Sequence, residues 1–310
     1  MRAVVSTNYG STPVLATVET PAPGPDDVRV KVHTSSLNGF DIALAGGYLK
    51  DLMEHRFPVV LGRDFAGTVD EVGENVTAFA PGDDVFGMVL TQPLSAGGFA
   101  EYVVVPQDHH IARMPAGLDH ATAGVLPLAG ASAMTALDAA RVGAGDTVLV
   151  SGATGGVGAF ALQMAAARGA TAVATARPGA ATEHVRSLGA AHAVDHTGDL
   201  AAQVRGIAPD GVDVVLHFAG DPFVLADLLA PGGRFVSLLS VGQEQLADRD
   251  VTATAVYASP GREQLEELGR SAAAGSLRIP VQRRYPLAEA PRAFPDFAAG
   301  KLGKLAVTID

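Results

Sequence analysis

A glycine-rich turn between an apolar run and a helical run is the stretch of this chain best suited to hold a charged ligand. Residues 147–177 read TVLVSGATGGVGAFALQMAAARGATAVATAR. Within them, Ala153-x-Gly155-x-x-Gly158 matches the dinucleotide fingerprint, with Ala in the first glycine position. Small residues let a pyrophosphate approach the backbone, and a helix that begins near Gly156 offers it free N–H groups and a positive dipole end. This context favours dinucleotide binding over a purely structural turn.

Three elements must position this turn. Apolar and β-branched residues predict strands over 147–150 and 171–175, and an unbroken Ala/Leu/Met-rich run predicts a helix over 157–168. After the second strand, an Asp or Glu would accept hydrogen bonds from the ribose hydroxyls of NAD, but this chain has Ala176-Arg177-Pro178. Arg177 can pair with a 2′-phosphate, which favours NADP(H). The alternative is a solvated loop arginine.

The composition changes at Pro115-Ala116-Gly117. Before this point, short β-rich runs between Gly, Pro, Asn and Asp predict an all-β, partly barrel-like module. After it, an Ala-rich helix over 119–141 precedes strands that alternate with helices, which implies a parallel sheet with right-handed crossovers. The remaining predicted strands are 212–218, 234–239 and 251–256, and the remaining predicted helices are 183–188, 223–229 and 262–274.

The tail over 277–310 returns to short strands and ends in the apolar run 305–309. We expect it to rejoin the first module. The predicted fold is therefore α/β: a doubly wound parallel sheet with a β-barrel-like domain.

Composition restricts the partners. The 310 residues carry a net charge of −11, which argues against nucleic-acid and anionic-membrane surfaces and favours a small-molecule substrate. The chain contains no cysteine, which removes disulfides, thiol nucleophiles and Cys-ligated zinc, and which fits a reducing cytoplasm. The N-terminus lacks the apolar core of a signal peptide, and the longest small-apolar stretch, 121–140, is interrupted by Pro127 and Asp138.

Several further segments stand in order along nearly the whole chain: Leu37-Asn38-x-x-Asp41, 58–87 (PVVLGRDFAGTVDEVGENVTAFAPGDDVFG), 97–106 (GGFAEYVVVP), 129–137, 152–158 (GATGGVG), 211–215, 231–234, 285–294 (YPLAEAPRAF) and 300–309 (GKLGKLAVTI). Together they resemble the medium-chain dehydrogenase/reductase superfamily and, within it, the zinc-free quinone oxidoreductase (zeta-crystallin-like) branch. The resemblance implies a GroES-like domain over 1–117, completed by 275–310, and a Rossmann NADP-binding domain over 118–274. Relatives of this branch are commonly dimers joined through an edge strand, so the resemblance implies a homodimer, with 251–256 as the candidate edge.

The same resemblance indicates a metal-free site. Zinc enzymes of the superfamily carry Cys where Asn38 falls, and Gly-His-Glu where this chain has Gly62-Arg63-Asp64. The remaining candidate ligands, His33, His109 and His110, have no recognised metal-site spacing. Satisfied or solvent-facing histidines are the preferred interpretation of these three residues.

Chemistry without a metal is easiest on an electron-poor acceptor: a quinone, or the β-carbon of an α,β-unsaturated carbonyl that receives a hydride from NADPH. Ordinary hydrogen-bond donors stabilise the charge that develops on the carbonyl oxygen. The resemblance implies Asn38 as a residue that orients the nicotinamide ribose or donates to the oxyanion, and Tyr48 as one that does the same or supplies a proton. The alternatives are a turn residue for Asn38 and a loop aromatic for Tyr48. Solvent protonation is a further possibility.

The other predicted site residues contact the cofactor. Gly155, Gly156 and Val157 face the pyrophosphate in this prediction, and a loop that begins with Thr175, Ala176 and Arg177 faces the 2′-phosphate. By resemblance, His196 approaches the adenosine phosphate, and the ribose or nicotinamide is lined by Thr135, Phe218, Leu239 and Ser240. His217, Asp41 and Asp64 are expected to be structural, the two acids as helix caps or ion-pair partners.

Three functions remain open. The leading hypothesis is an NADPH-dependent quinone or activated-alkene reductase. The second is an enoyl reductase of a polyketide or other secondary-metabolite pathway, which shares the chemistry and differs in the pocket. The third is a non-catalytic NADPH-binding protein that keeps the fold.

Overall fold

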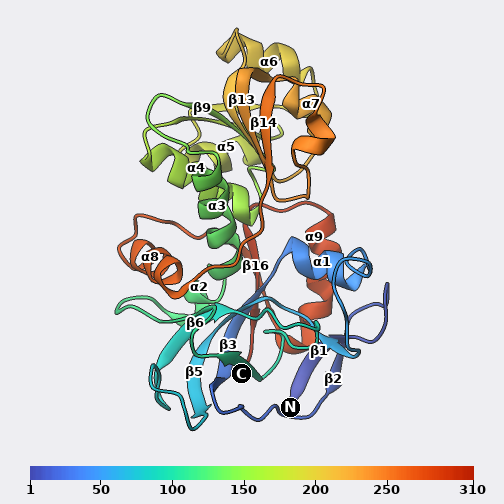
Figure 1. Cartoon of the computed structure of the whole chain (residues 1–310), viewed down its shortest axis with the longest axis vertical. Helices are drawn as coiled ribbons and strands as arrows, with labels where there is room; N and C mark the ends of the chain where they lie inside the picture. Colours follow the sequence, from blue (N-terminus) through green and yellow to red (C-terminus); the bar gives the residue numbers. More distant parts are fainter. The chain divides into compact units, whose positions relative to one another are not determined.

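The computed structural model describes all 310 residues and contains two compact units. One comprises Met1–Ala131 and Ser259–Asp310, the other Ser132–Ala258 (Figure 1). The predicted boundaries, after 117 and after 274, differ from these, because the first unit also holds residues 118–131 and 259–274. The reason is packing: a Cβ on Gly269 of α8 (Arg262–Ala273) would lie only 3.0 Å from the Phe86 ring and 3.1 Å from Pro115.

A six-stranded parallel sheet is the centre of the unit Ser132–Ala258, which confirms the predicted fold class. Its order is β11-β10-β9-β12-β13-β14. The chain enters in the middle at β9, builds outward through β10 and β11, and then crosses to β12. The carboxyl ends of β9 and β12 therefore form the topological switch point, where open α/β sheets bind ligands. The strands are β9 (Thr147–Ser151), β10 (Thr171–Thr175), β11 (His192–Val194), β12 (Val212–His217), β13 (Leu229–Ser237) and β14 (Val251–Ala255).

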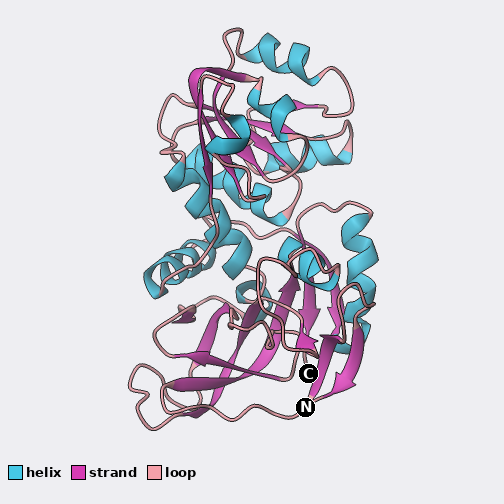
Figure 2. Cartoon of the chain, turned by 45° about the vertical axis from the view of Figure 1, so that its right-hand side comes forward, coloured by secondary structure: helices cyan, strands magenta, loops and turns pink.

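Helices lie around the strands of this sheet (Figure 2), and the residues of the central strands are buried. These strands therefore consist of nearly continuous apolar residues. They are α4 (Gly156–Ala167), α5 (Ala180–Ser187), α6 (Leu200–Ile207) and α7 (Pro222–Ala226), with a 3₁₀ turn η1 (Gln243–Leu246). Strand β11 and helix α6 were not predicted, because β11 has only three residues and α6 has only eight, with an apolar stripe of three side chains, Leu200, Val204 and Ile207.

The predicted helix over 119–141 is wrong in its continuity. It is two helices, α2 (His120–Ala123) and α3 (Pro127–Ala139). Gly124 caps the first helix, and Pro127, which lacks an N–H, begins the second.

The other unit is built from antiparallel strands closed by the tail, as expected. Strand β16 (Lys304–Thr308) pairs antiparallel with β3 (Asp27–Leu37), with Leu305 opposite Leu37. Strand β15 (Val281–Pro286) pairs with β16 in the parallel direction, the one parallel strand pair of this unit. The large sheet has the order β15-β16-β3-β5-β6-β8, and β7 also pairs with β3; a smaller sheet has the order β2-β1-β4. The other strands are β1 (Arg2–Ser6), β2 (Val14–Thr17), β4 (Val59–Val60), β5 (Asp64–Val72), β6 (Asp84–Met88), β7 (Tyr102–Pro106) and β8 (Ile111–Arg113).

Alternation along β3 and β5 places apolar side chains in one core, which the tail completes with Leu305 and Val307. Helix α1 (Gly39–Ala45) leaves this core directly after β3, so the strand end and the helix start meet at Asn38. A 3₁₀ segment η2 (Leu287–Arg292) and α9 (Ala293–Ala298) join β15 to the loop before β16. Every helix of the structure is too short or too polar to cross a bilayer.

Candidate functional site

The carboxyl ends of the parallel strands bring most of the predicted cofactor residues to one edge of the Ser132–Ala258 sheet. Because β9, β10, β11, β12 and β13 are neighbours in the sheet, the loops that leave them lie side by side. The residues carried by these loops are Gly155, Gly156 and Val157 after β9, Ala176 and Arg177 after β10, His196 after β11, Phe218 after β12, and Leu239 and Ser240 after β13. Thr175 ends β10, and Thr135 lies half-buried on α3 of the same unit.

The turn after β9 ends in a helix start that no side chain caps. Gly155 is the N-cap of α4 and supplies no side-chain hydrogen bond. The first N–H groups of a helix have no partner within the helix, so those that follow Gly155 are available to an anion. Thr175 steadies the turn from the neighbouring strand, since its Oγ1 accepts a hydrogen bond from Gly152 N at 3.1 Å. These features fit a bound pyrophosphate.

Gly158 is the third small residue of the fingerprint, and its surroundings exclude any side chain. A Cβ there would lie 2.5 Å from Ala153 Cα and 2.8 Å from the Ala153 carbonyl carbon, and still closer to Gly152 O. All three are backbone atoms, so a side chain at this position would block the approach of α4 to the end of β9. The sequence pattern identifies Gly158 by its spacing, and the structure shows the steric reason why a glycine is required at this position.

Arg177 and His196 lie close enough to share one acidic neighbour. Both side chains are exposed. Hydrogen bonds from Thr197 lower the pKa of Asp195, and the positive fields of His196 and Arg177 lower it further by smaller amounts. No ion pair engages the Arg177 guanidinium. The loops after β10 and β11 thus bring an arginine without an ion pair and a histidine close to the same carboxylate, that of Asp195.

His217 holds the turn that carries Leu239 and Ser240. Its side chain is buried, and burial lowers its pKa, so it is neutral near pH 7. Nε2 faces the Gly220 carbonyl at 3.1 Å and must donate, so Nδ1 accepts from Ser237 Oγ at 3.0 Å. Ser237 Oγ in turn accepts from Leu239 N at 2.9 Å. His217 is therefore a structural residue in this unit, as expected.

The sequence reasoning missed Tyr257. It lies just beyond the carboxyl end of the edge strand β14, is 68% exposed, and its hydroxyl lies 2.8 Å from Ser240 Oγ. Ser240 itself has a positive φ of 61°, which is uncommon for a non-glycine residue. The signal that could have found Tyr257 is its position after a parallel strand, at the same edge as the other site residues.

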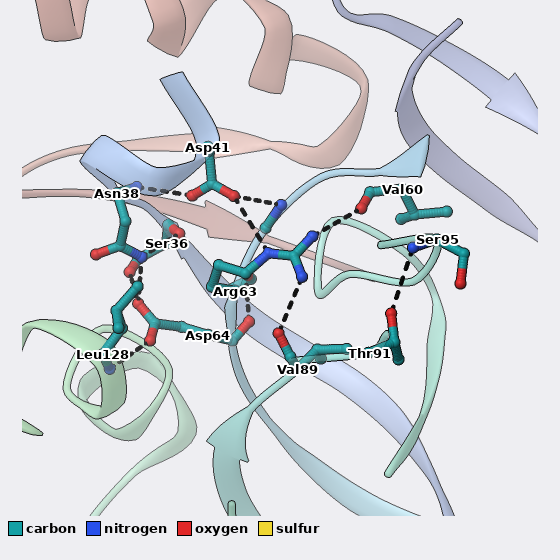
Figure 3. A network of polar contacts seen from close by, with 12 residues as sticks. Ser36, Asn38, Asp41, Val60, Arg63, Asp64, Val89, Thr91, Ser95 and Leu128 are labelled. Carbon is teal, nitrogen blue, oxygen red and sulfur yellow. Dashed lines mark hydrogen bonds and ion pairs between the residues drawn. The ribbon is translucent and has the colours of Figure 1, made fainter. Parts of the chain in front are cut away.

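In the first unit, a buried polar network surrounds Asn38 (Figure 3). Asn38 is 7% exposed and is the N-cap of α1. Its backbone N–H donates to Asp41 Oδ2 at 2.9 Å. Its amide Nδ2 donates to Asp64 Oδ2 at 2.8 Å and to Ser36 O at 3.2 Å, and its Oδ1 accepts from Lys304 Nζ at 2.6 Å. Both amide hydrogens of Asn38 are therefore used inside the protein.

Asp64 is the acceptor at the centre of this network. It is fully buried and accepts from Ser36 Oγ, from Asn38 Nδ2 and, at 2.7 Å, from the backbone N–H of Leu128. Lys304 Nζ lies 3.4 Å from Asp64 Oδ2 and is itself only 2% exposed. Burial lowers the pKa of Lys304, and Asp64 opposes that shift. The pair is a buried acid–base couple that the sequence pattern did not predict.

Asp41 and Arg63 form a second buried couple. Asp41 Oδ1 accepts from Gly62 N at 2.9 Å and lies 3.9 Å from Arg63 Nε. Burial raises the pKa of Asp41 to about 6, and Arg63 counteracts the shift. Arg63 also donates to the carbonyls of Val89 and Val60, while its Nε has no hydrogen-bond partner. The expected ion-pair and capping roles of Asp41 are both present.

Tyr48 contrasts with Asn38. It is 77% exposed, and its ring covers Gly46, where a Cβ would lie 2.7 Å from Tyr48 Cε2. The structure shows no hydrogen bond between Tyr48 and the Asn38 network. Its phenol is therefore a solvent-facing donor, close in sequence to Asn38 but in a different environment.

The histidines considered as metal ligands are dispersed. His33 Nε2 contacts Thr68 Oγ1 at 3.1 Å and its ring packs edge-on against His120, while His110 contacts Pro260 O. Where zinc relatives carry Cys and His, the structure places the Asn38 amide and the buried Arg63 guanidinium. No group of three or more His, Cys, Asp or Glu side chains is arranged to hold a metal ion.

Known proteins share this architecture. A family model described as the alcohol dehydrogenase GroES-like domain matches residues 24–116, and one described as zinc-binding dehydrogenase matches residues 188–307. The chain is 31% identical to a mitochondrial NAD(P)H oxidoreductase of Danio rerio, over 92% of this chain and 84% of that relative. It is 36% identical to the spectinabilin polyketide synthase system protein NorB of Streptomyces orinoci, over 92% of this chain but 13% of the much longer relative. The solved structure of the quinone oxidoreductase from Coxiella burnetii superimposes with a TM-score of 0.90 at 29% identity, covering 100% of this chain and 99% of that one.

Proposed function

The chain belongs to the medium-chain dehydrogenase/reductase superfamily, in its quinone oxidoreductase-like branch, and we propose that it is an NADPH-dependent reductase of quinones or activated alkenes. The family uses NAD(P)H; the choice of NADPH rests on the uncommitted Arg177 guanidinium beside His196. Strand β10 is followed by Ala176-Arg177 and carries no acid of its own at this end, which agrees with this choice. The carboxylate that follows β11, Asp195, accepts hydrogen bonds from Thr197. This arrangement is the observation that carries the proposal.

The cofactor, when bound, supplies a hydride. The N-terminus of α4 and the Gly155–Gly158 turn would hold its pyrophosphate, and the loops of Phe218, Leu239 and Ser240 would orient its nicotinamide end. His217 keeps the Leu239 loop in place through Ser237.

Asn38 and Tyr48 have different roles in this proposal. Both Asn38 amide hydrogens are used by Asp64 and Ser36, so Asn38 binds a ligand hydroxyl as an acceptor and does not donate to an oxyanion. Tyr48, with its free and exposed phenol, is the better donor to a developing oxyanion or proton source. Solvent supplies the proton if Tyr48 does not.

An enoyl reductase is the second candidate, and the 36% identity to NorB favours it. The chemistry is the same hydride addition to a C=C bond conjugated to a carbonyl. The difference is the acceptor, which in that case is an enoyl thioester.

The test follows NADPH oxidation with 1,4-benzoquinone, a simple enone and an enoyl thioester. We expect turnover with at least one of the first two. Turnover restricted to the thioester supports the enoyl reductase. Tight NADPH binding without turnover on any acceptor excludes both enzymes and favours the non-catalytic binding protein.

Cofactor choice is tested with Arg177→Glu, and with Arg186→Glu on the exposed face of α5 as a matched charge reversal. Losing a charge-assisted pair costs about 1.5–3 kcal/mol, so the preference for NADPH over NADH should fall by roughly 10- to 100-fold in the first variant. The control should keep the wild-type preference. An unchanged preference in Arg177→Glu removes the argument for NADPH.

The edge strand β14 supports a homodimer, because no other strand pairs with its outer side. Within the chain, the Gln243 side chain bonds to this side, at Ala253 N and Val251 O. Light scattering should give twice the mass of the chain. The N–H of Ala255, the last residue of β14, lies on the side away from β13, because the next N–H, of Val256, bonds to Ser237 O. Substituting Pro for Ala255 should therefore yield monomers if this edge pairs. Dimers of that variant would place the interface elsewhere.

A further inference from the structure

The amide of Asn38 can take only one orientation in this protein, and a lysine far along the chain sets it. Lys304 Nζ lies 2.6 Å from Asn38 Oδ1, and Asp64 Oδ2 lies 2.8 Å from Asn38 Nδ2. Exchanging the two amide atoms would place an NH₂ group against an ammonium group and an oxygen against a carboxylate. Both contacts would be repulsive, so the assignment follows from the charges.

The orientation determines what Asn38 offers to a ligand. Its two N–H bonds point to Asp64 and Ser36, and one lone pair of Oδ1 faces Lys304. A carbonyl oxygen has two lone pairs, so one acceptor position remains. The only group that this position can bind is a donor, such as a hydroxyl.

We infer that Lys304 is a positioning residue that makes Asn38 an acceptor-only contact for a ligand hydroxyl. The inference rests on the proposed function, because the hydroxyl belongs to the bound cofactor or to the reduced acceptor. The nicotinamide ribose carries such hydroxyls, and a hydroquinone product carries two. Quinones and enones carry none, so Asn38 does not recognise the oxidised acceptor.

Lys304 is suited to this role because it is held from all sides. It is 2% exposed, and Asp64 compensates its charge at 3.4 Å. It is the first residue of β16, directly before Leu305, which pairs with Leu37 of β3. Asp64 is fixed in turn by the N–H of Leu128 at the start of α3. The ammonium group therefore connects β16, the β3–α1 junction, β5 and α3 at one point.

Two variants separate positioning from stability. Lys304→Met removes the donor to Asn38 Oδ1 with little change in length, and Lys304→Gln keeps a neutral N–H donor in reach of it. Lys301→Met is the matched control: it removes a nearby positive charge whose amine lies 3.2 Å above the Phe297 ring and makes no hydrogen bond to Asn38. Thermal unfolding reports any general loss of stability in each variant.

The readout is a ratio that a purely structural role would leave unchanged. In one arm, calorimetry compares the Kd of NADPH with that of an analogue lacking the nicotinamide-ribose hydroxyls. In the other, inhibition by hydroquinone is compared with inhibition by 1,4-dimethoxybenzene. The ratio is the dissociation or inhibition constant of the ligand without hydroxyls divided by that of the ligand with hydroxyls. In the wild-type protein, one hydrogen bond to Asn38 predicts a ratio of roughly 2 to 12 in the arm whose hydroxyl Asn38 binds. The ratio should fall towards 1 in Lys304→Met and persist in Lys304→Gln and Lys301→Met.

A second variant keeps the test decisive if Lys304→Met does not fold. Asn38→Ala removes the acceptor and places no new charge beside Asp64, so the ratio should fall to 1, and an unchanged ratio in this variant overturns the inference as well. Equal ratios in the wild type and Lys304→Met, or a wild-type ratio of 1 in both arms, overturn the inference. Failure of the wild-type protein to bind NADPH at all refutes the proposed function instead, so the two failures are distinguishable.

Discussion

Replacing Gly158 with Ala tests whether the close approach of α4 to the end of β9 is required for the fold and the cofactor site. The added Cβ would lie 2.5 Å from Ala153 Cα and 2.8 Å from the Ala153 carbonyl carbon, where ordinary contacts are 3.4–4 Å. Both neighbours are backbone atoms and cannot rotate away, so the helix must shift. Overpacking of this kind costs about 1–3 kcal/mol.

A matched substitution isolates that steric cost. Gly206 lies in α6, and a Cβ there meets no atom within 4 Å. Alanine is favoured over glycine in a helix by roughly 1 kcal/mol, and both variants receive this gain. Gly206→Ala should therefore be more stable than the wild type, and Gly158→Ala should be less stable than Gly206→Ala by about 1–3 kcal/mol.

The assay is urea unfolding followed by circular dichroism, together with calorimetric titration of NADPH. Gly158→Ala should also bind NADPH more weakly, because the shifted helix start moves the N–H groups that follow Gly155. Gly206→Ala should bind it as the wild type does. If Gly158→Ala matches Gly206→Ala in both measurements, the packing argument is refuted.

Three further predictions concern buried charge and capping. Arg63→Met leaves the Asp41 carboxylate buried without its cation and should destabilise the protein by about 3–5 kcal/mol in urea titrations; a loss below 1 kcal/mol would contradict the couple. Burial raises the pKa of Asp41 to about 6, so the folded state binds that proton more tightly than the unfolded chain, and its contribution to the unfolding free energy should grow as pH falls from 7 to 5. Asp41→Asn should lack this component. Asp221 caps α7 by accepting hydrogen bonds from two backbone N–H groups. Asp221→Ala should therefore lower the unfolding free energy by about 1 kcal/mol in thermal unfolding. An unchanged midpoint would show that this cap does not stabilise the protein.

The sequence by itself determined the parallel sheet and its dinucleotide turn. Both depend on short-range patterns: apolar runs of strand length, helix-forming runs between them, and small residues at three fixed spacings. The tail was also predictable as β structure, and its pairing of Leu305 with Leu37 agrees with the expectation that it rejoins the first module. Short or interrupted elements were not predictable, since β11 has three residues and Pro127 divides one Ala-rich stretch into two helices.

Only the tertiary structure decided what surrounds Asn38. Lys304 is 266 positions away in sequence, and a lysine in a Gly-Lys-rich loop would ordinarily be solvated. Its burial follows from the pairing of β16 with β3, which brings the ammonium group to Asn38 and Asp64. The periodicity of hydrophobic residues and the spacing of residues within a motif carry no information on such a long-range contact. The amide orientation that we propose for ligand recognition is therefore a property of the assembled sheet.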